Sequence, residues 1–186
     1  MPGFDKDTAL RVGETALIID SSLKRLLTDV NEKSALRSSE QEFYSEQIGL
    51  CRDYIADSML HPTIERFPEL ASSAVLSVEN EQPETTVAGS SLSKDGLFQE
   101  RNIAISVSET LLVISAIADN SLSRTLPQLS ASESEAYRYT VSSIMLDCVT
   151  LLNQIWRTHP DLLPSDMRDS LSFSRMFSKT SLRAPK

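Results

Sequence analysis

The amino-acid sequence predicts an all-α protein, a four-helix bundle built from two similar antiparallel helical hairpins. Long proline-free tracts carry apolar residues at alternating spacings of three and four, no segment alternates apolar and polar residues as a half-buried strand does, and short motifs recur about 95 residues apart. The chain has 186 residues, of which 40% are apolar and 24% charged, as is typical of a globular domain. We therefore expect one helical domain over residues 1–186.

The first hairpin is predicted over residues 5–79. Its long helices, at about residues 5–32 and 39–60, each place apolar side chains on one continuous stripe. Proline just beyond a helix end stops the helix and can begin the next one, so a shorter helix is expected at residues 69–79. The two stripes are Val12, Ala16, Ile19, Leu23, Leu26 and Val30, and then Tyr44, Ile48, Cys51, Ile55 and Met59.

The second hairpin is predicted over residues 97–177, after a linker at residues 80–96 that is rich in Gly, Ser, Thr and acidic residues. Long helices are expected at about residues 97–120 and 131–158, with a shorter one at residues 165–177. A basic tail, residues 178–186, follows, and we expect it to be solvated. The stripes are Ile103, Val107, Leu111, Ile114 and Ala118, and then Tyr137, Val141, Ile144, Cys148, Leu151 and Ile155.

The two hairpins share an order of motifs. "VGETALIID" at residues 12–20 returns as "VSETLLVIS" at residues 107–115, with five of nine positions identical. Capping boxes are predicted at Ser39 with Glu42 and at Ser132 with Glu135. Each is followed by a tyrosine, a cysteine on the stripe and a His-Pro pair, at offsets of 93 to 98 residues. This order favours a duplicated hairpin, although helical stripes in one bundle also resemble each other without duplication.

Charge and composition exclude several classes of function. The net charge of −8 and the pI near 4.8 argue against binding of nucleic-acid phosphates or anionic lipid by bulk electrostatics, and favour a basic partner. We found neither a secretory leader nor an apolar run that approaches the length of a membrane span. Two cysteines are too few for a disulfide framework. We therefore expect a cytoplasmic protein with no membrane and no nucleic-acid partner.

No set of residues predicts a cofactor, a metal or a catalytic nucleophile. A di-iron bundle needs Glu-x-x-His, but Ser58 and Trp156 precede the two histidines by three positions. A zinc site from Cys51, His61, Cys148 and His159 would need ligands roughly 15 Å apart along each helix to meet. The chain has neither a Gly-x-Ser-x-Gly elbow nor a glycine-rich phosphate loop. The cysteines are expected to be buried core residues, and each histidine to interact with the last carbonyls of its helix.

Glu14 and Glu109 are the candidate pocket residues. Each interrupts a second apolar patch, formed around Glu14 by Leu10, Leu17 and Ile18. Buried together, the two carboxylates would be desolvated and could act as an acid pair or ligate a metal. If the two carboxylates face solvent, they have no special role. If they belong to a partner-binding surface, they are charges at its rim.

Two surfaces are candidates for binding a protein partner. The acidic residues of the second helix lie opposite its apolar stripe, where they could receive a basic partner or the basic tail. The fourth helix extends its apolar arc beyond the stripe, as a deeply buried helix or an interface helix does. The candidates are Glu42, Glu46, Asp53 and Asp57 in the first surface, and Met145, Val149 and Trp156 in the second.

These observations favour a non-enzymatic helical protein-binding module, either adaptor or regulatory, whose partner is another protein or a second copy in a homodimer. The alternative is a small-molecule-binding protein or enzyme with a pocket between the two hairpins.

Overall fold

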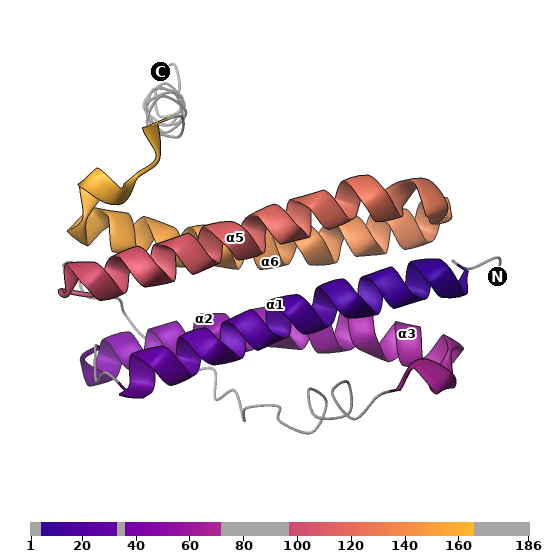
Figure 1. Cartoon of the computed structure of the whole chain (residues 1–186), viewed down its shortest axis with the longest axis horizontal. Coiled ribbons are helices and arrows are strands. Elements are labelled where there is room, and N and C mark those ends of the chain that lie inside the picture. Colours follow the sequence, from indigo (N-terminus) through magenta and orange to yellow (C-terminus); the bar gives the residue numbers. More distant parts are fainter. Residues whose placement is uncertain (1–4, 33–35, 72–96, 166–186) are drawn as a thin grey trace, which may run out of the picture.

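The computed structural model describes residues 5–32, 36–71 and 97–165, and within these residues the chain is helical and contains no strand. Four long helices lie side by side (Figure 1). They are α1 (Lys6–Glu32), α2 (Ser38–Ile55), α5 (Arg101–Thr125) and α6 (Ala131–Thr158). Short helical segments extend them: η1 (Ala56–Leu60), α3 (His61–Arg66) and η2 (Pro68–Leu70) after α2, η3 (Leu126–Gln128) after α5, and η4 (Pro160–Leu162) after α6.

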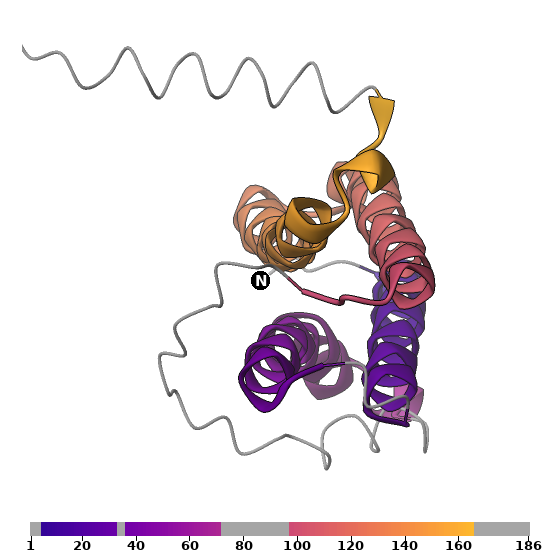
Figure 2. The ribbon, with the colours of Figure 1, turned by 90° about the vertical axis from the view of Figure 1, so that its left-hand side faces the viewer.

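The four long helices form two pairs. α1 packs against α2, and α5 packs against α6; α1 also packs against α5, and α2 against α6. Seen along the helices, the α1–α2 pair lies beside the α5–α6 pair (Figure 2). The chain direction in α1 is opposite to that in α5, and the direction in α2 is opposite to that in α6 (Figure 1).

The core lies between the four helices and consists of the predicted stripes. Every stripe residue named above is buried, as the three-four spacing requires if one face of each helix is to exclude water. The predicted helices at residues 5–32 and 131–158 are confirmed almost to the residue by α1 and α6. The all-α prediction is therefore confirmed.

The predicted end of the second helix at His61-Pro62 is wrong. The helix continues through η1, a π-helical turn, into α3 and ends at Arg66. Pro62 has no N–H to donate and its ring would clash with a carbonyl one α-helical turn earlier. The wider π turn accommodates it, and the N–H of His61 bonds the carbonyl of Ala56, five residues back.

The predicted capping boxes are two residues too late. The backbone N–H of Arg37 bonds Oε2 of Glu40 at 3.0 Å, and the N–H of Ser130 bonds Oε2 of Glu133 at 2.9 Å. Both segments contain glutamates two residues apart, so the sequence offers more than one frame for a cap. In each case the earlier glutamate, the third residue of the helix, makes the capping bond.

The third helix begins four residues later than the predicted residue 97. Leu97 and Phe98 are buried before the helix starts, and the backbone N–H of Leu97 bonds the carbonyl of Gln154 at 3.2 Å. Phe98 has a positive φ of 59°, a strained value for a side chain of its size. These contacts with α6 hold the segment in a conformation that prevents an earlier helix start.

Several predicted segments lie outside the described residues: the linker at residues 80–96, the basic tail at 178–186, and nearly all of the short helices at 69–79 and 165–177. Of these short helices, the described portions are η2, which ends at Leu70, and Ser165. Prolines 68 and 160 begin η2 and η4, as expected of proline at a first helical position.

One helix resembles a membrane span in its length and its apolar composition. Arg101–Gln128, which comprises α5 and η3, is long and apolar enough to cross a membrane, with a mean hydropathy of 1.4 over its most apolar window. The expectation that no apolar run approaches the length of a membrane span is therefore wrong. In this fold one side of α5 packs against α1 and α6, and core helices meet the same criteria.

Backbone landmarks recur between the two halves at nearly constant offsets. Lys6 and Arg101, the first residues of α1 and α5, differ by 95, and Ser38 and Ala131, the first residues of α2 and α6, differ by 93. After the π turn the offset becomes 92: Phe67 has φ −129° and ψ 74°, and His159 has φ −128° and ψ 73°. A π turn adds one residue to a helix, which accounts for the change from 93 to 92.

Candidate functional site

Glu14 and Glu109 do not share a site. Both are exposed, Glu14 on α1 and Glu109 on α5. Glu14 lines a groove of about 260 Å³ between α1 and α5, which we name the α1–α5 groove. Among the α5 residues that line this groove, Ile117 is the closest to Glu109 along the helix. Eight residues along a helix correspond to about 12 Å, so Glu109 lies well away from this groove. The other residues that line the groove are Arg11, Thr15, Ile18, Asn120, Ser121, Arg124 and Thr125.

A second groove, the α1–α3 groove, opens on the other side of Glu14. It has a volume of about 200 Å³ and a mostly apolar wall. Gly13 lies in it, and the point where a Cβ would stand on Gly13 is open. Sequence reasoning missed this groove, because it lies beside α3, where a helix end was predicted. Its wall includes Gly13, Glu14, Leu17, Leu60, Ile64 and Leu70.

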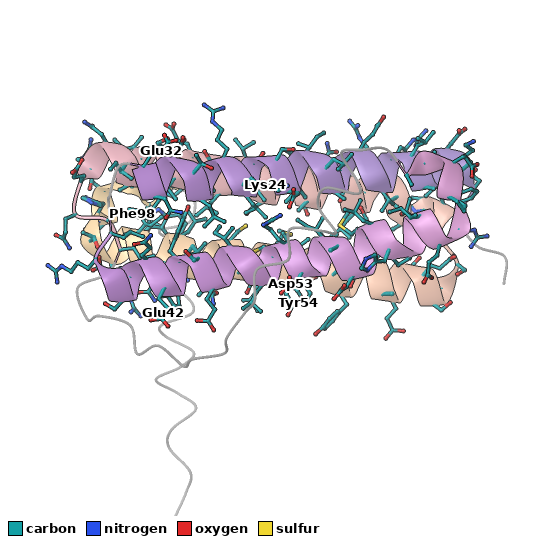
Figure 3. All side chains as sticks on the ribbon, turned by 90° about the horizontal axis from the view of Figure 1, so that it is seen from below. Lys24, Glu32, Glu42, Asp53, Tyr54 and Phe98 are labelled. Atoms are coloured by element: carbon teal, nitrogen blue, oxygen red, sulfur yellow. The ribbon has the colours of Figure 1, made fainter. Side chains whose placement is uncertain are left out.

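The acidic residues of α2 form a ridge along its outer side. Figure 3 shows Glu42 and Asp53 on the side of α2 that faces away from α1. Glu42 and Asp57 are exposed, whereas Glu46 and Asp53 are half-buried. Oδ1 of Asp57 lies 3.3 Å from Nδ1 of His61, one turn further along the helix. The ridge is thus a row of surface carboxylates, one of which already contacts a histidine.

The outer face of α6 carries exposed apolar side chains, and of the three α6 residues that the sequence singled out only Val149 is among them. Trp156 is buried with 7% exposure and belongs to the core, and Met145 is half-buried. Val149 is 39% exposed, and the larger exposures belong to Tyr139 at 68% and Leu146 at 65%. The outer face of α6 is therefore defined by Tyr139, Ser142, Leu146 and Val149. The sequence signal for this face is that Tyr139 and Leu146 are seven residues, or two helical turns, apart and lie opposite the buried stripe of α6.

A buried ion pair joins α1 to α2. Nε of Arg52 donates a hydrogen bond to Oδ1 of Asp20 at 2.7 Å, and Nζ of Lys24 lies 3.5 Å from Oδ2 of Asp20. Both partners are nearly inaccessible to water, so the pair is structural. Asp20 closes the repeated nine-residue motif, and its counterpart there is Ser115. The presence of Asp at this position in one copy of the motif and Ser in the other was the sequence signal for the ion pair.

The two cysteines lie together in the core, between α2 and α6. Both are fully buried, and a hydrogen bond with Cys148 together with burial raises the pKa of the Cys51 thiol. The Cys51 thiol also lies 3.8 Å from Oδ2 of Asp147. Half burial raises the pKa of Asp147, partly offset by the hydrogen bond from Cys51. A buried thiol with a raised pKa is a poor nucleophile.

The two histidines have different roles. Nε2 of His159 donates a hydrogen bond to the carbonyl oxygen of Phe98 at 2.8 Å, so the expected bond to its own helix is replaced by one to the segment before α5. His61 instead contacts Asp57 on the surface. Among the described residues, no group of three His, Cys, Asp or Glu side chains is arranged to hold a metal ion.

Comparison of the chain with protein-family models, with curated protein sequences and with solved structures finds no match.

Proposed function

We propose that the protein is a non-enzymatic helical binding module, a four-helix bundle of two duplicated hairpins that recognises another protein through the outer face of α6. The observation that carries this proposal is the exposure of Tyr139 and Leu146, at 68% and 65%. Large apolar side chains grouped on a surface are a feature of sites that bind another protein.

The duplication is supported by the positions that are buried in α1 and α5. Each helix buries nine residues, and an offset of 95 superposes eight of them, from Thr8 on Ile103 to Val30 on Thr125. Along α2 and α6 the offset of 93 pairs Tyr44 with Tyr137. The shift to 92 after the π turn pairs Leu60 with Leu152. The shared order of motifs favoured a repeat, but this register pairs Cys51 with Ile144 rather than with Cys148, and His61 with Asn153 rather than with His159.

The same register distinguishes the outer face of α6 from the corresponding face of α2. Position 139 corresponds to position 46, and position 146 to position 53, because both pairs differ by 93. The outer face of α2 therefore carries Glu46 and Asp53 where α6 carries Tyr139 and Leu146. An apolar face at one copy and an acidic face at the other suits a partner that contacts α6 alone.

The alternative function is small-molecule binding in the α1–α5 groove. It is favoured by one observation, the presence of both polar and apolar groups in its wall, with Arg11, Glu14 and Arg124 among them. Arginine pairs well with carboxylate or phosphate groups, so an anionic ligand would suit this groove. The exposed apolar face of α6 is unexplained by this alternative.

Photo-crosslinking in the native host distinguishes the faces. A photoreactive phenylalanine analogue replaces Tyr139 in one protein and Glu46 in a matched control. We expect a crosslinked partner from position 139, and loss of that product when Leu146→Asp copies the α2 surface. A product of doubled mass identifies a homodimer. Equal products from both positions, or a product that survives Leu146→Asp in a folded protein, contradicts the proposal.

A further inference from the structure

The α1–α3 groove has a counterpart in the second half that is filled. With the offsets of 95 for α1 and 92 for α3, Gly13 corresponds to Ser108 and Ile64 to Trp156. Ser108 is 4% exposed and Trp156 is 7% exposed, whereas Gly13 and Ile64 are partly exposed. The second half thus carries larger, buried side chains at the positions that border an open groove in the first.

Most of the rest of the wall is alike in the two halves, although Leu10 and Thr63 correspond to Ile105 and Ile155. Leu17 and Leu60 correspond to Leu112 and Leu152, and Leu70 corresponds to Leu162. The changes from Ser to Gly, from Trp to Ile and from Ile to Thr each reduce the side-chain volume at the open site, and the change from Trp to Ile is the largest of the three. The apolar surroundings that accept an indole ring in one half are present in the other without it.

We propose that the α1–α3 groove binds an aromatic side chain, of indole or phenyl size, from a partner protein. The inference rests on the duplication proposed above, which supplies the register. An apolar cavity of about 150 Å³ holds a benzene ring, and the groove has a volume of about 200 Å³. Aromatic side chains are also common anchors in protein interfaces, because they bury a large area with few rotatable bonds.

Acidic residues near the α1–α3 groove favour a partner segment with basic residues on either side of the aromatic side chain. Glu14 lines the groove and Glu65 follows Ile64 on α3, and both are exposed. The chain as a whole carries a net charge of −8. A basic segment that carries the aromatic residue is therefore attracted to the rim, and an acidic segment is repelled.

The first test uses indole itself and the full chain. Methyl NMR signals of Leu60, Ile64 and Leu70 should shift on titration with indole. Gly13→Ser combined with Ile64→Trp copies the second half and should weaken indole binding at least tenfold in a folded protein. Val113→Trp, which adds a tryptophan at an exposed position of α5 outside both grooves, is the matched control and should bind as the parent does. Indole binding that survives the filled groove overturns the proposal.

The reverse variant, Ser108→Gly with Trp156→Ile, opens the counterpart. It should bind a second indole and shift the methyl signals of Leu112 and Leu162. If this core variant does not fold, the filled variant decides alone. A parent that binds no indole until Phe4, Phe173 or Phe177 is changed to Ala overturns the proposal and assigns the groove to the chain's own segment.

Peptides test the partner chemistry. A short peptide with one Trp between lysines should bind at least threefold more tightly than the same peptide with glutamates. Glu14→Gln with Glu65→Gln should remove most of that preference. Equal affinities in the parent overturn the basic flank. These outcomes do not depend on Tyr139 or Leu146, so failure of this site is distinguishable from failure of the α6 face.

Discussion

Asp20 and Arg52 form a buried ion pair that ties α1 to α2, with Oδ1 and Nε 2.7 Å apart and only 3% and 9% of the side chains exposed. In the proposed repeat the equivalent positions are Ser115 and Met145, which differ from them by 95 and 93. One hairpin thus uses two charges where the other uses a hydroxyl and a thioether. A buried ion pair is often no more stabilising than well-packed neutral residues, but loss of one partner leaves a charge without compensation.

The first prediction exchanges the pair for its counterpart. Arg52→Met should lower the free energy of unfolding by about 3 kcal/mol, because Asp20 stays buried and retains only Lys24 at 3.5 Å. Asp20→Ser with Arg52→Met should recover most of that loss, to within about 1 kcal/mol of the parent. Urea unfolding monitored by circular dichroism measures both. A double variant as unstable as the single one would contradict the repeat at this position.

Sequence periodicity predicted the helices and the core because burial of one helical face requires a three-four spacing, which Val12 to Val30 and Tyr137 to Ile155 follow. It could not predict the end of α2. His61-Pro62 and His159-Pro160 have the same sequence, but only the second pair ends its helix. Whether the helix ends at the His-Pro pair depends on whether a π turn forms before the proline, and the formation of that turn depends on packing around η1.

The candidate sites were less predictable for a related reason. A helical wheel identifies which side of a helix is apolar, but not which neighbour covers it. Trp156 is in the core because α6 turns that side toward the other helices, while Tyr139 and Leu146 remain outside. The α1–α3 groove depends on a helix continuing where its end was predicted. It also depends on Gly13 and Ile64 being smaller than their counterparts, a comparison that needs the structural register.

The second prediction concerns the π turn. Deleting Ala56 together with Pro62→Ala should convert η1 to α-helix while keeping α3 in register, because the π turn holds one extra residue. Deleting Ile48, in the regular part of α2, should instead rotate every later residue by about 100° away from the core and abolish cooperative unfolding. Thermal unfolding of both variants provides the measurement. Equal damage from the two deletions would show that the extra residue at η1 is not dispensable.

The third prediction is a pH dependence. Half burial raises the pKa of Asp147 above its usual value of 3.8, so its ionisation costs stability as the pH rises from the unfolded pKa through the folded one. Asp147→Asn, which can still accept a hydrogen bond from Cys51, should be more stable than the parent at pH 7. The advantage should shrink as the pH falls through the raised folded pKa toward about 3.8, and it should be absent below that, where the carboxyl is protonated in both states. Denaturant unfolding across this range tests it. A constant difference would indicate a packing effect instead.

The last prediction separates the two histidines that the sequence presents as a pair. Nε2 of His159 bonds the carbonyl oxygen of Phe98, a fully buried residue whose φ is 59° and whose ring packs edge-on against Tyr44 with centroids 5.5 Å apart. His159→Ala should therefore lower the free energy of unfolding by about 1–2 kcal/mol, the cost of leaving a buried carbonyl without a donor.

His61 is the matched control, because it precedes Pro62 but contacts Asp57 through side chains that are 42% and 63% exposed. An exposed ion pair contributes little, so His61→Ala should change stability by less than about 0.5 kcal/mol. Urea unfolding gives both values, and amide hydrogen exchange near Leu97 reports whether the segment before α5 opens only in the His159 variant. Equal losses in the two variants would mean that the bond to Phe98 does not hold this segment, and that the proline which follows each histidine determines its effect.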